Sequence, residues 1–106
     1  MQISDLSRSI MKILEDKKAY DIVEFNLTEC LTKISDACII ASGTSSRHLQ
    51  SVADHVYRYL KCEHLKPRME GKAESGWVIV ESHGCELHLF KPELRTYYAL
   101  EELLQA

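Results

Sequence analysis

The pattern of apolar and polar positions is clearest between Asp36 and Leu60. An uninterrupted apolar run, Ala37 to Ala41, is typical of a strand that is buried on both faces. The next segment, Ser42 to Ser46, contains Gly43, which permits a sharp turn, and hydroxyl groups that can cap a helix. Apolar side chains then repeat at helical spacing, at Leu49, Val52, Ala53, Val56 and Leu60. This stretch therefore predicts a buried strand, a tight turn and an amphipathic helix, around which the remaining elements are organised.

The N-terminal part of the chain predicts one helix and one half-exposed strand. An apolar stripe at helical spacing favours a helix from about Ser4 to Lys18. Apolar and polar residues then alternate from Ile22 to Leu27, which indicates a strand with one face toward solvent. The segment from Thr28 to Ser35 has no clear period.

The C-terminal part predicts three strands and a last helix. In order, we expect a brief strand at Arg68–Met69, a polar loop over Glu70–Gly76, a strand at Trp77–Val80, a turn at Ser82–Gly84, a strand at Cys85–Phe90, and a helix that Pro92 opens and that reaches Leu104. The element order is α-β-β-α-β-β-β-α. We therefore expect one α/β domain over residues 1–106, with a mixed sheet of about five strands and helices packed on it.

Charge and composition narrow the classes of partner. Thirteen Lys and Arg residues against 16 Asp and Glu residues give a net charge of −3. This charge argues against a protein that binds mainly to the phosphate groups of DNA or another nucleic acid. No apolar run approaches the roughly 20 residues of a membrane span. The N-terminus lacks the apolar core of a signal peptide, because Asp5 and Arg8 interrupt it. We expect a cytoplasmic protein that does not contact membranes.

The turn Gly43-Thr44-Ser45-Ser46 is the first candidate for chemistry. A glycine turn that leads into a helix N-terminus offers backbone amides to a phosphate. However, the turn matches neither the P-loop nor the dinucleotide-binding motif, so a capped helix start is the simpler interpretation. A nucleotide-binding transferase that uses this turn stays as an alternative.

The other constellations favour no catalytic, metal or cofactor site. Ser51, Asp54 and His55 lie on a helix, where a nucleophile lacks a strained elbow and an oxyanion hole. The four cysteines, Cys30, Cys38, Cys62 and Cys85, fit neither a zinc spacing nor a disulfide framework. We therefore expect free structural thiols.

An aromatic and basic segment lies at the start of the last helix. It comprises Phe90, Lys91, Arg95, Tyr97 and Tyr98, and Trp77 lies nearby in the predicted hairpin. Aromatic side chains with an arginine are enriched at protein-binding hot spots. They are equally ordinary where a helix packs on a sheet, so composition alone does not decide between the two interpretations.

Several stretches together resemble the ribosomal silencing factor family, also called Iojap-like. They are residues 36–48 (DACIIASGTSSRH), Ala53-Asp54-His55-Val56, Glu70-Gly71, Gly76-Trp77, His88-Leu89-Phe90, and residues 95–101 (RTYYALE). The resemblance covers the chain from about Leu14 to Leu104, and it is the combination of stretches that is specific.

The resemblance implies a fold, an activity and a partner. The family folds as a small α/β domain akin to nucleotidyltransferases but lacks their activity, and here no Asp-x-Asp pair for metal ions follows the Gly43 turn. Its members bind the large ribosomal subunit through the fourteenth large-subunit ribosomal protein. This contact blocks association with the small subunit and represses translation in nutrient limitation. Members also self-associate as dimers away from the ribosome.

We accordingly predict a ribosome-binding anti-association factor that is not an enzyme and needs no cofactor. Its expected partner-binding residues are Trp77, His88, Phe90, Lys91, Arg95, Tyr97 and Tyr98, with Trp77 and Tyr98 foremost. A protein-interaction module in ribosome assembly is the second alternative.

Overall fold

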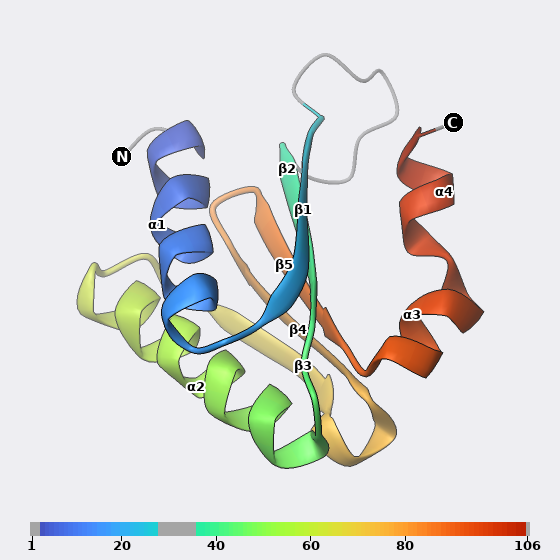
Figure 1. Cartoon of the computed structure of the whole chain (residues 1–106). Coiled ribbons are helices and arrows are strands. Elements are labelled where there is room, and N and C mark those ends of the chain that lie inside the picture. The colour runs from blue at the N-terminus through green and yellow to red at the C-terminus, as the bar shows by residue number, and fades with distance from the viewer. Residues whose placement is uncertain (1–2, 28–35, 106) are drawn as a thin grey trace.

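The computed structural model describes residues 3–27 and 36–105 of the chain. These residues form five strands, four α-helices and one short 3-10 helix (Figure 1). In chain order they are α1 (Ile3–Asp16), β1 (Tyr20–Asn26), β2 (Ala37–Ser42), α2 (Ser46–Cys62), β3 (Arg68–Lys72), η1 (Ala73–Ser75), β4 (Trp77–Ser82), β5 (Cys85–Phe90), α3 (Pro92–Tyr98) and α4 (Leu100–Gln105). The segment from Thr28 to Ser35, with Cys30, lies outside the described residues.

The five strands form a single mixed sheet in the order β1-β2-β5-β4-β3. Strands β2 and β5 are parallel, whereas the other three neighbouring pairs are antiparallel. The long helix α2 carries the chain from β2 to the far edge of the sheet, and the β3-β4-β5 meander then returns to β2. The predicted α/β class with a mixed sheet of five strands is confirmed.

Helices cover the two faces of the sheet unequally. Helices α1 and α2 pack on one face, while the shorter α3 and α4 lie on the other (Figure 1). The main core lies under α1 and α2 and includes Leu14, Ile39, Leu49, Val56 and Leu87, all without exposed surface. A smaller cluster of Cys38, Ile40 and Phe90 lies on the α3 side and is edged by half-buried side chains. Strand β2 is buried along its whole length, as its apolar run predicts.

The turn between β2 and α2 has the predicted form. The Ser45 hydroxyl accepts a hydrogen bond from the His48 backbone N–H at 3.1 Å and caps α2. Gly43 does not have a positive φ, but a Cβ there would lie 2.7 Å from Cδ2 of Leu49. Its backbone N–H donates to the Phe90 carbonyl at 2.9 Å, so the turn also joins the ends of the parallel strands β2 and β5.

Most element boundaries differ from the sequence prediction by one or two residues, and two elements differ more. Strand β3 extends to Lys72, because it pairs with β4 over its full length. The last helix is broken at Ala99, which has φ 49° and ends α3 in the left-handed conformation. No glycine or proline marks this break, so it has no local sequence signal. None of the helices in the described part of the chain is long and apolar enough to span a membrane.

Candidate functional site

Five aromatic rings gather on the face of the sheet that carries α3. Trp77 is on β4, His88 and Phe90 are on β5, and Tyr97 and Tyr98 are on α3. We refer to these five residues as the aromatic cluster. Antiparallel pairing of β4 with β5 places Trp77 directly opposite Phe90, and their ring centroids are 5.0 Å apart. Tyr98 reaches the same place from α3, with its ring centroid 4.6 Å from that of Trp77.

Exposure rises steeply through the aromatic cluster from the sheet outward. Phe90 is fully buried and His88 is 6% exposed, whereas Trp77 is half-buried. Tyr98 is 46% exposed and Tyr97 is 78% exposed, and the two rings meet edge-to-face. Among the residues that the structure describes, Tyr97 and Tyr98 are the large hydrophobic residues that are exposed rather than buried or half-buried. Exposed aromatic rings on a packed base are typical of a binding surface.

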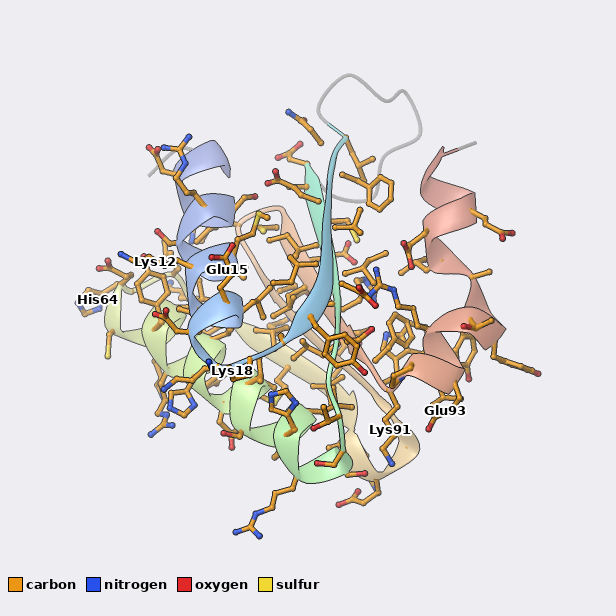
Figure 2. The ribbon with its side chains drawn as sticks, viewed as in Figure 1. Lys12, Glu15, Lys18, His64, Lys91 and Glu93 are labelled. Carbon is orange, nitrogen blue, oxygen red and sulfur yellow. The ribbon has the colours of Figure 1, made fainter. Side chains whose placement is uncertain are left out.

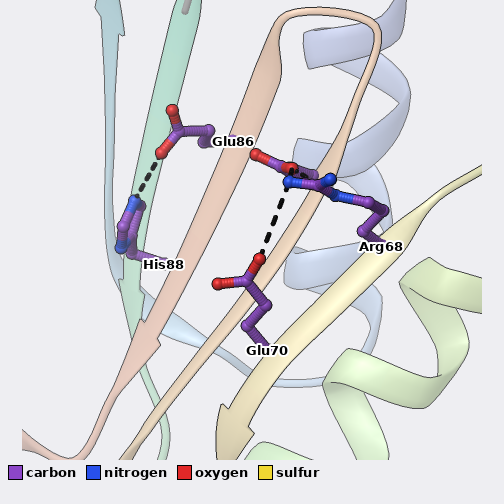
Figure 3. Close-up of polar contacts among 5 residues, drawn as sticks. Arg68, Glu70, Glu86 and His88 are labelled. Carbon is purple, nitrogen blue, oxygen red and sulfur yellow. Dashed lines mark hydrogen bonds and ion pairs between the residues drawn. The ribbon is translucent and has the colours of Figure 1, made fainter. Parts of the chain in front are cut away.

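The Trp77 indole is also held by a hydrogen bond to the strand beside it. Its Nε1–H donates to Nδ1 of His88 at 3.1 Å. The other ring nitrogen of His88 lies 3.0 Å from Oε1 of Glu86, two residues earlier on the same face of β5 (Figure 3). Burial, and to a lesser extent the negative charge of Glu86, raises the pKa of the nearby Cys38 thiol to about 12.

The start of α3 is fixed to the sheet by a close backbone approach. The Lys91 backbone N–H donates to the Gly76 carbonyl at 2.9 Å, and Pro92 begins the helix. Gly76 has φ 87°, and a Cβ there would collide with Leu94 of α3. Figure 2 shows Lys91 and Glu93 at this end of α3, on the side of the sheet opposite Lys12 and Lys18.

Arg95 fixes the other end of α3 rather than pointing into solvent. Its Nη1 donates to Oγ of Ser42 at 2.8 Å, and its Nε donates to Oε1 of Glu101 on α4. The Arg95 side chain is only 12% exposed. Hydrogen bonding to Arg95 holds the pKa of Glu101 below its usual range. Arg95 therefore joins the end of β2, α3 and α4, and so determines where Tyr98 lies.

Carboxylates dominate the open part of the same sheet face. The alternation of the strands places Arg68, Glu70, Glu81 and Glu86 on the side that carries Trp77 (Figure 3). Nε of Arg68 donates to Oε1 of Glu81 at 2.7 Å, and Nη2 lies 3.7 Å from Oε1 of Glu70. Arg68 thus contacts the carboxylates of Glu70 and Glu81. With Glu86 and with Lys72 opposite Trp77, this face carries three acidic and two basic side chains on β3, β4 and β5.

The remaining candidate constellations are not assembled as catalytic or metal sites. Nδ1 of His55 bonds to the Ser51 backbone carbonyl, and the Asp54 carboxylate accepts a hydrogen bond from Gln50 instead of meeting His55. No group of three or more potential metal ligands occurs within residues 3–27 and 36–105. Cys38, Cys62 and Cys85 are free, and Cys38 and Cys85 are buried.

Comparison with known proteins assigns the chain to a family. Residues 1–106 match the family model described as "Ribosomal silencing factor during starvation". The chain belongs to the ribosomal silencing factor family. It is 33% identical over 104 residues to ribosomal silencing factor RsfS of Chromobacterium violaceum, covering 97% of this chain and 84% of the relative. It is also 32% identical to "Mitochondrial assembly of ribosomal large subunit protein 1" of Mus musculus, covering 89% of this chain but 42% of that protein.

Solved structures agree with the assignment. A crystal structure of a Chromobacterium violaceum protein superimposes with a TM-score of 0.90 at 33% identity, over 100% of this chain and 88% of that chain. A crystal structure from Bacillus halodurans gives a TM-score of 0.81 at 26% identity, over 94% of this chain and 93% of that one. The family assignment and the predicted fold therefore rest on independent comparisons of sequence and of structure.

In this silencing factor the structure brings the predicted site residues into one region, in different roles. The rings of Trp77, Tyr97 and Tyr98 form its accessible part. His88 and Phe90 contact the Trp77 ring from the sheet. Arg95 anchors α3 to Ser42 and Glu101, and Lys91 is the N-cap residue of α3. Sequence reasoning did not identify Ser42, Glu86 and Glu101 as functional positions. For Glu86 the sequence did contain a signal: residues two apart on a strand lie on the same face, so Glu86 shares a face with His88.

Proposed function

We propose that this silencing factor uses the aromatic cluster to bind the large ribosomal subunit through its fourteenth ribosomal protein. The bound factor sterically blocks association with the small subunit and represses translation, above all when nutrients are scarce. The observation that carries the proposal is the pair of exposed tyrosines on a buried aromatic base, within a chain of the silencing factor family.

The construction of the aromatic cluster supports a role in protein binding. Tyrosine and tryptophan provide large contact areas with few rotatable bonds, so little side-chain entropy is lost on binding. Here the rings are already packed without a partner, because Trp77 contacts both Phe90 and Tyr98, which also contact each other. Preorganisation of this kind reduces the entropic cost of association.

The charge of the surroundings favours a basic protein over ribosomal RNA as the main contact. The sheet face beside the aromatic cluster carries the carboxylates of Glu70, Glu81 and Glu86 against the cations of Arg68 and Lys72, and the whole chain has a net charge of −3. Carboxylates repel the phosphate backbone of RNA, whereas they attract lysine and arginine side chains of a protein partner. Steric occlusion requires no chemical step.

The printed name of the mouse relative favours a second candidate function. That protein is named for assembly of the mitochondrial ribosomal large subunit, and this chain matches less than half of it. The same docking surface could therefore serve the assembly of the large subunit instead of silencing. Both functions share the partner and differ in the step that is affected.

Co-sedimentation with separated ribosomal subunits tests the proposal directly. We expect the protein to pellet with large subunits and not with small subunits, and to reduce the formation of joined ribosomes in a light-scattering assay. Binding to large subunits without inhibition of joining would favour the assembly function. No binding to the large subunit would exclude both. Away from ribosomes we expect a homodimer, which sedimentation equilibrium would detect.

A further inference from the structure

We propose that His88 is a positioning residue: the pair of buried His88 and half-buried Glu86 holds the Trp77 indole in the orientation in which it docks. The inference rests on the proposed docking function of the aromatic cluster, and it names His88 as the residue that sets the orientation of the Trp77 ring. His88 acts through Trp77 and does not contact the partner itself.

The hydrogen bonds determine the state of the imidazole. The indole nitrogen of Trp77 is only a donor, so Nδ1 of His88 must accept and carries no proton. The ring must then carry its proton on Nε2, from which it donates to the Glu86 carboxylate at 3.0 Å. The network thus selects the neutral Nε2–H form of His88.

Burial gives these bonds their directing effect. The His88 and Glu86 side chains are 8% and 18% exposed, so water competes little for either hydrogen bond. His88 lies on the central strand β5 and pairs in register with Ile79 of β4 and with Ile40 of β2, so its backbone has a strand on either side.

Stacking alone does not determine the orientation of the Trp77 ring. The rings of Phe90 and Tyr98 contact Trp77 with centroids 5.0 and 4.6 Å away and lie 6.3 Å from each other, which fixes the plane of the indole against them. A rotation of about 180° around the Cβ–Cγ bond keeps that plane, and with it the ring contacts, but moves Nε1 to the opposite edge. The bond from Nε1 to His88 is directional and therefore selects one rotation.

Three substitutions separate positioning from direct contact. His88→Leu removes the acceptor, His88→Asn keeps an oxygen acceptor near the position of Nδ1, and Trp77→Phe removes the donor. We expect His88→Leu to weaken large-subunit binding about five- to ten-fold, which corresponds to one lost hydrogen bond. His88→Asn should stay within about three-fold of the wild type. In the Trp77→Phe background, His88→Leu should have no further effect, as a double-mutant cycle requires for a residue that acts through its neighbour.

Spectroscopy of the free protein tests the same network without ribosomes. Trp77 is the single tryptophan, so the indole N–H gives one resonance. We expect a long-range proton–nitrogen spectrum of the wild type to show His88 protonated on Nε2 only. The indole N–H should exchange slowly with solvent in the wild type and in His88→Asn, and faster in His88→Leu. Glu86→Met should accelerate solvent exchange of the Trp77 indole N–H proton and of the His88 Nε2–H proton.

The outcomes distinguish this inference from the proposed function. A His88 that is protonated on Nδ1 would overturn the inference. So would an equal loss of large-subunit binding when His88→Leu is made in the wild type and in Trp77→Phe. If His88→Leu fails to fold, the wild-type spectrum and His88→Asn still decide. If the wild type does not bind large subunits, the docking function fails, while the exchange measurements still test the hydrogen bonds.

Discussion

Tyr98→Ala is the substitution that best separates docking from folding. Tyr98 is 46% exposed, so about half of its ring stabilises the fold and about half is accessible to a partner. Fully burying a large apolar side chain contributes about 1.5–3 kcal/mol, and an aromatic pair adds about 0.5–1.5 kcal/mol. Removal of the half-buried ring should therefore reduce the free energy of unfolding by roughly 1–2 kcal/mol, from the 5–15 kcal/mol that is usual for a domain. The variant should remain folded.

The expected loss of binding is larger than the loss of stability. Truncation of a hot-spot aromatic side chain typically costs at least about 2 kcal/mol of binding free energy, which is some thirty-fold in affinity. Titration of purified large subunits in a co-sedimentation assay measures this directly, and inhibition of subunit joining should decrease in parallel. Circular dichroism melting curves on the same sample verify that the variant is folded. Trp77→Ala should weaken binding by a similar factor, but it also removes three ring contacts and a hydrogen bond from the fold.

Tyr57→Ala provides a matched control for Tyr98→Ala. Tyr57 is a partly exposed tyrosine on α2, which covers the opposite face of the sheet. We expect Tyr57→Ala to leave the affinity for the large subunit within about two-fold of the wild type, and the same holds for Arg58→Ala on the same helix. The argument fails if folded Tyr98→Ala binds with wild-type affinity, or if Tyr57→Ala is equally impaired.

Three further predictions concern other parts of the molecule. Gly43→Val should lower the free energy of unfolding by roughly 1–3 kcal/mol, because its Cβ would press on Leu49, and an unchanged melting temperature would contradict this. The lowered pKa of Glu101 means that its bond to Arg95 stabilises the fold above the ordinary carboxyl range and loses this effect as the pH falls through the folded-state value. The melting temperatures of wild type and Glu101→Gln should therefore differ at pH 7 and converge in acid. Calorimetry should detect no magnesium-dependent binding of nucleoside triphosphates, and micromolar binding that Ser45→Ala abolishes would instead favour an enzyme.

Local sequence patterns predicted the strand, turn and helix between Asp36 and Leu60, because each of these signals acts over a few residues. The apolar run of β2, the hydroxyl cap at Ser45 and the stripe of α2 are each determined by neighbours within one or two turns. The break at Ala99 could not be predicted in this way. Alanine itself favours an uninterrupted helix. The break coincides with two long-range features, the packing of Leu100 on the small core cluster and the Arg95–Glu101 contact across Ala99.

Strand order and the long-range polar contacts were also beyond the local pattern. The insertion of β5 between β2 and β4 depends on which apolar faces meet, and alternation identifies a face without identifying its neighbour. Arg95 and Ser42 are 53 residues apart in sequence, so their hydrogen bond has no local signal. By contrast, the hairpin pattern was sufficient to place Trp77 on the same sheet region as Phe90. The sequence could therefore predict the centre of the candidate site but not the contacts that hold it.

Under the proposed docking function, we expect the packed aromatic cluster to act mainly on the lifetime of the complex with the large subunit. A protein that works by occlusion must stay bound longer than the small subunit takes to arrive. Changes within one interface usually alter the dissociation rate much more than the association rate. Tyr98 is not charged, so its loss leaves long-range electrostatic attraction to a basic partner unaltered. We therefore expect the thirty-fold loss in Tyr98→Ala to arise from faster dissociation, with an association rate within about three-fold of the wild type. Stopped-flow displacement from large subunits would measure both rates, and an equally large decrease in the association rate would show that the cluster instead guides the encounter.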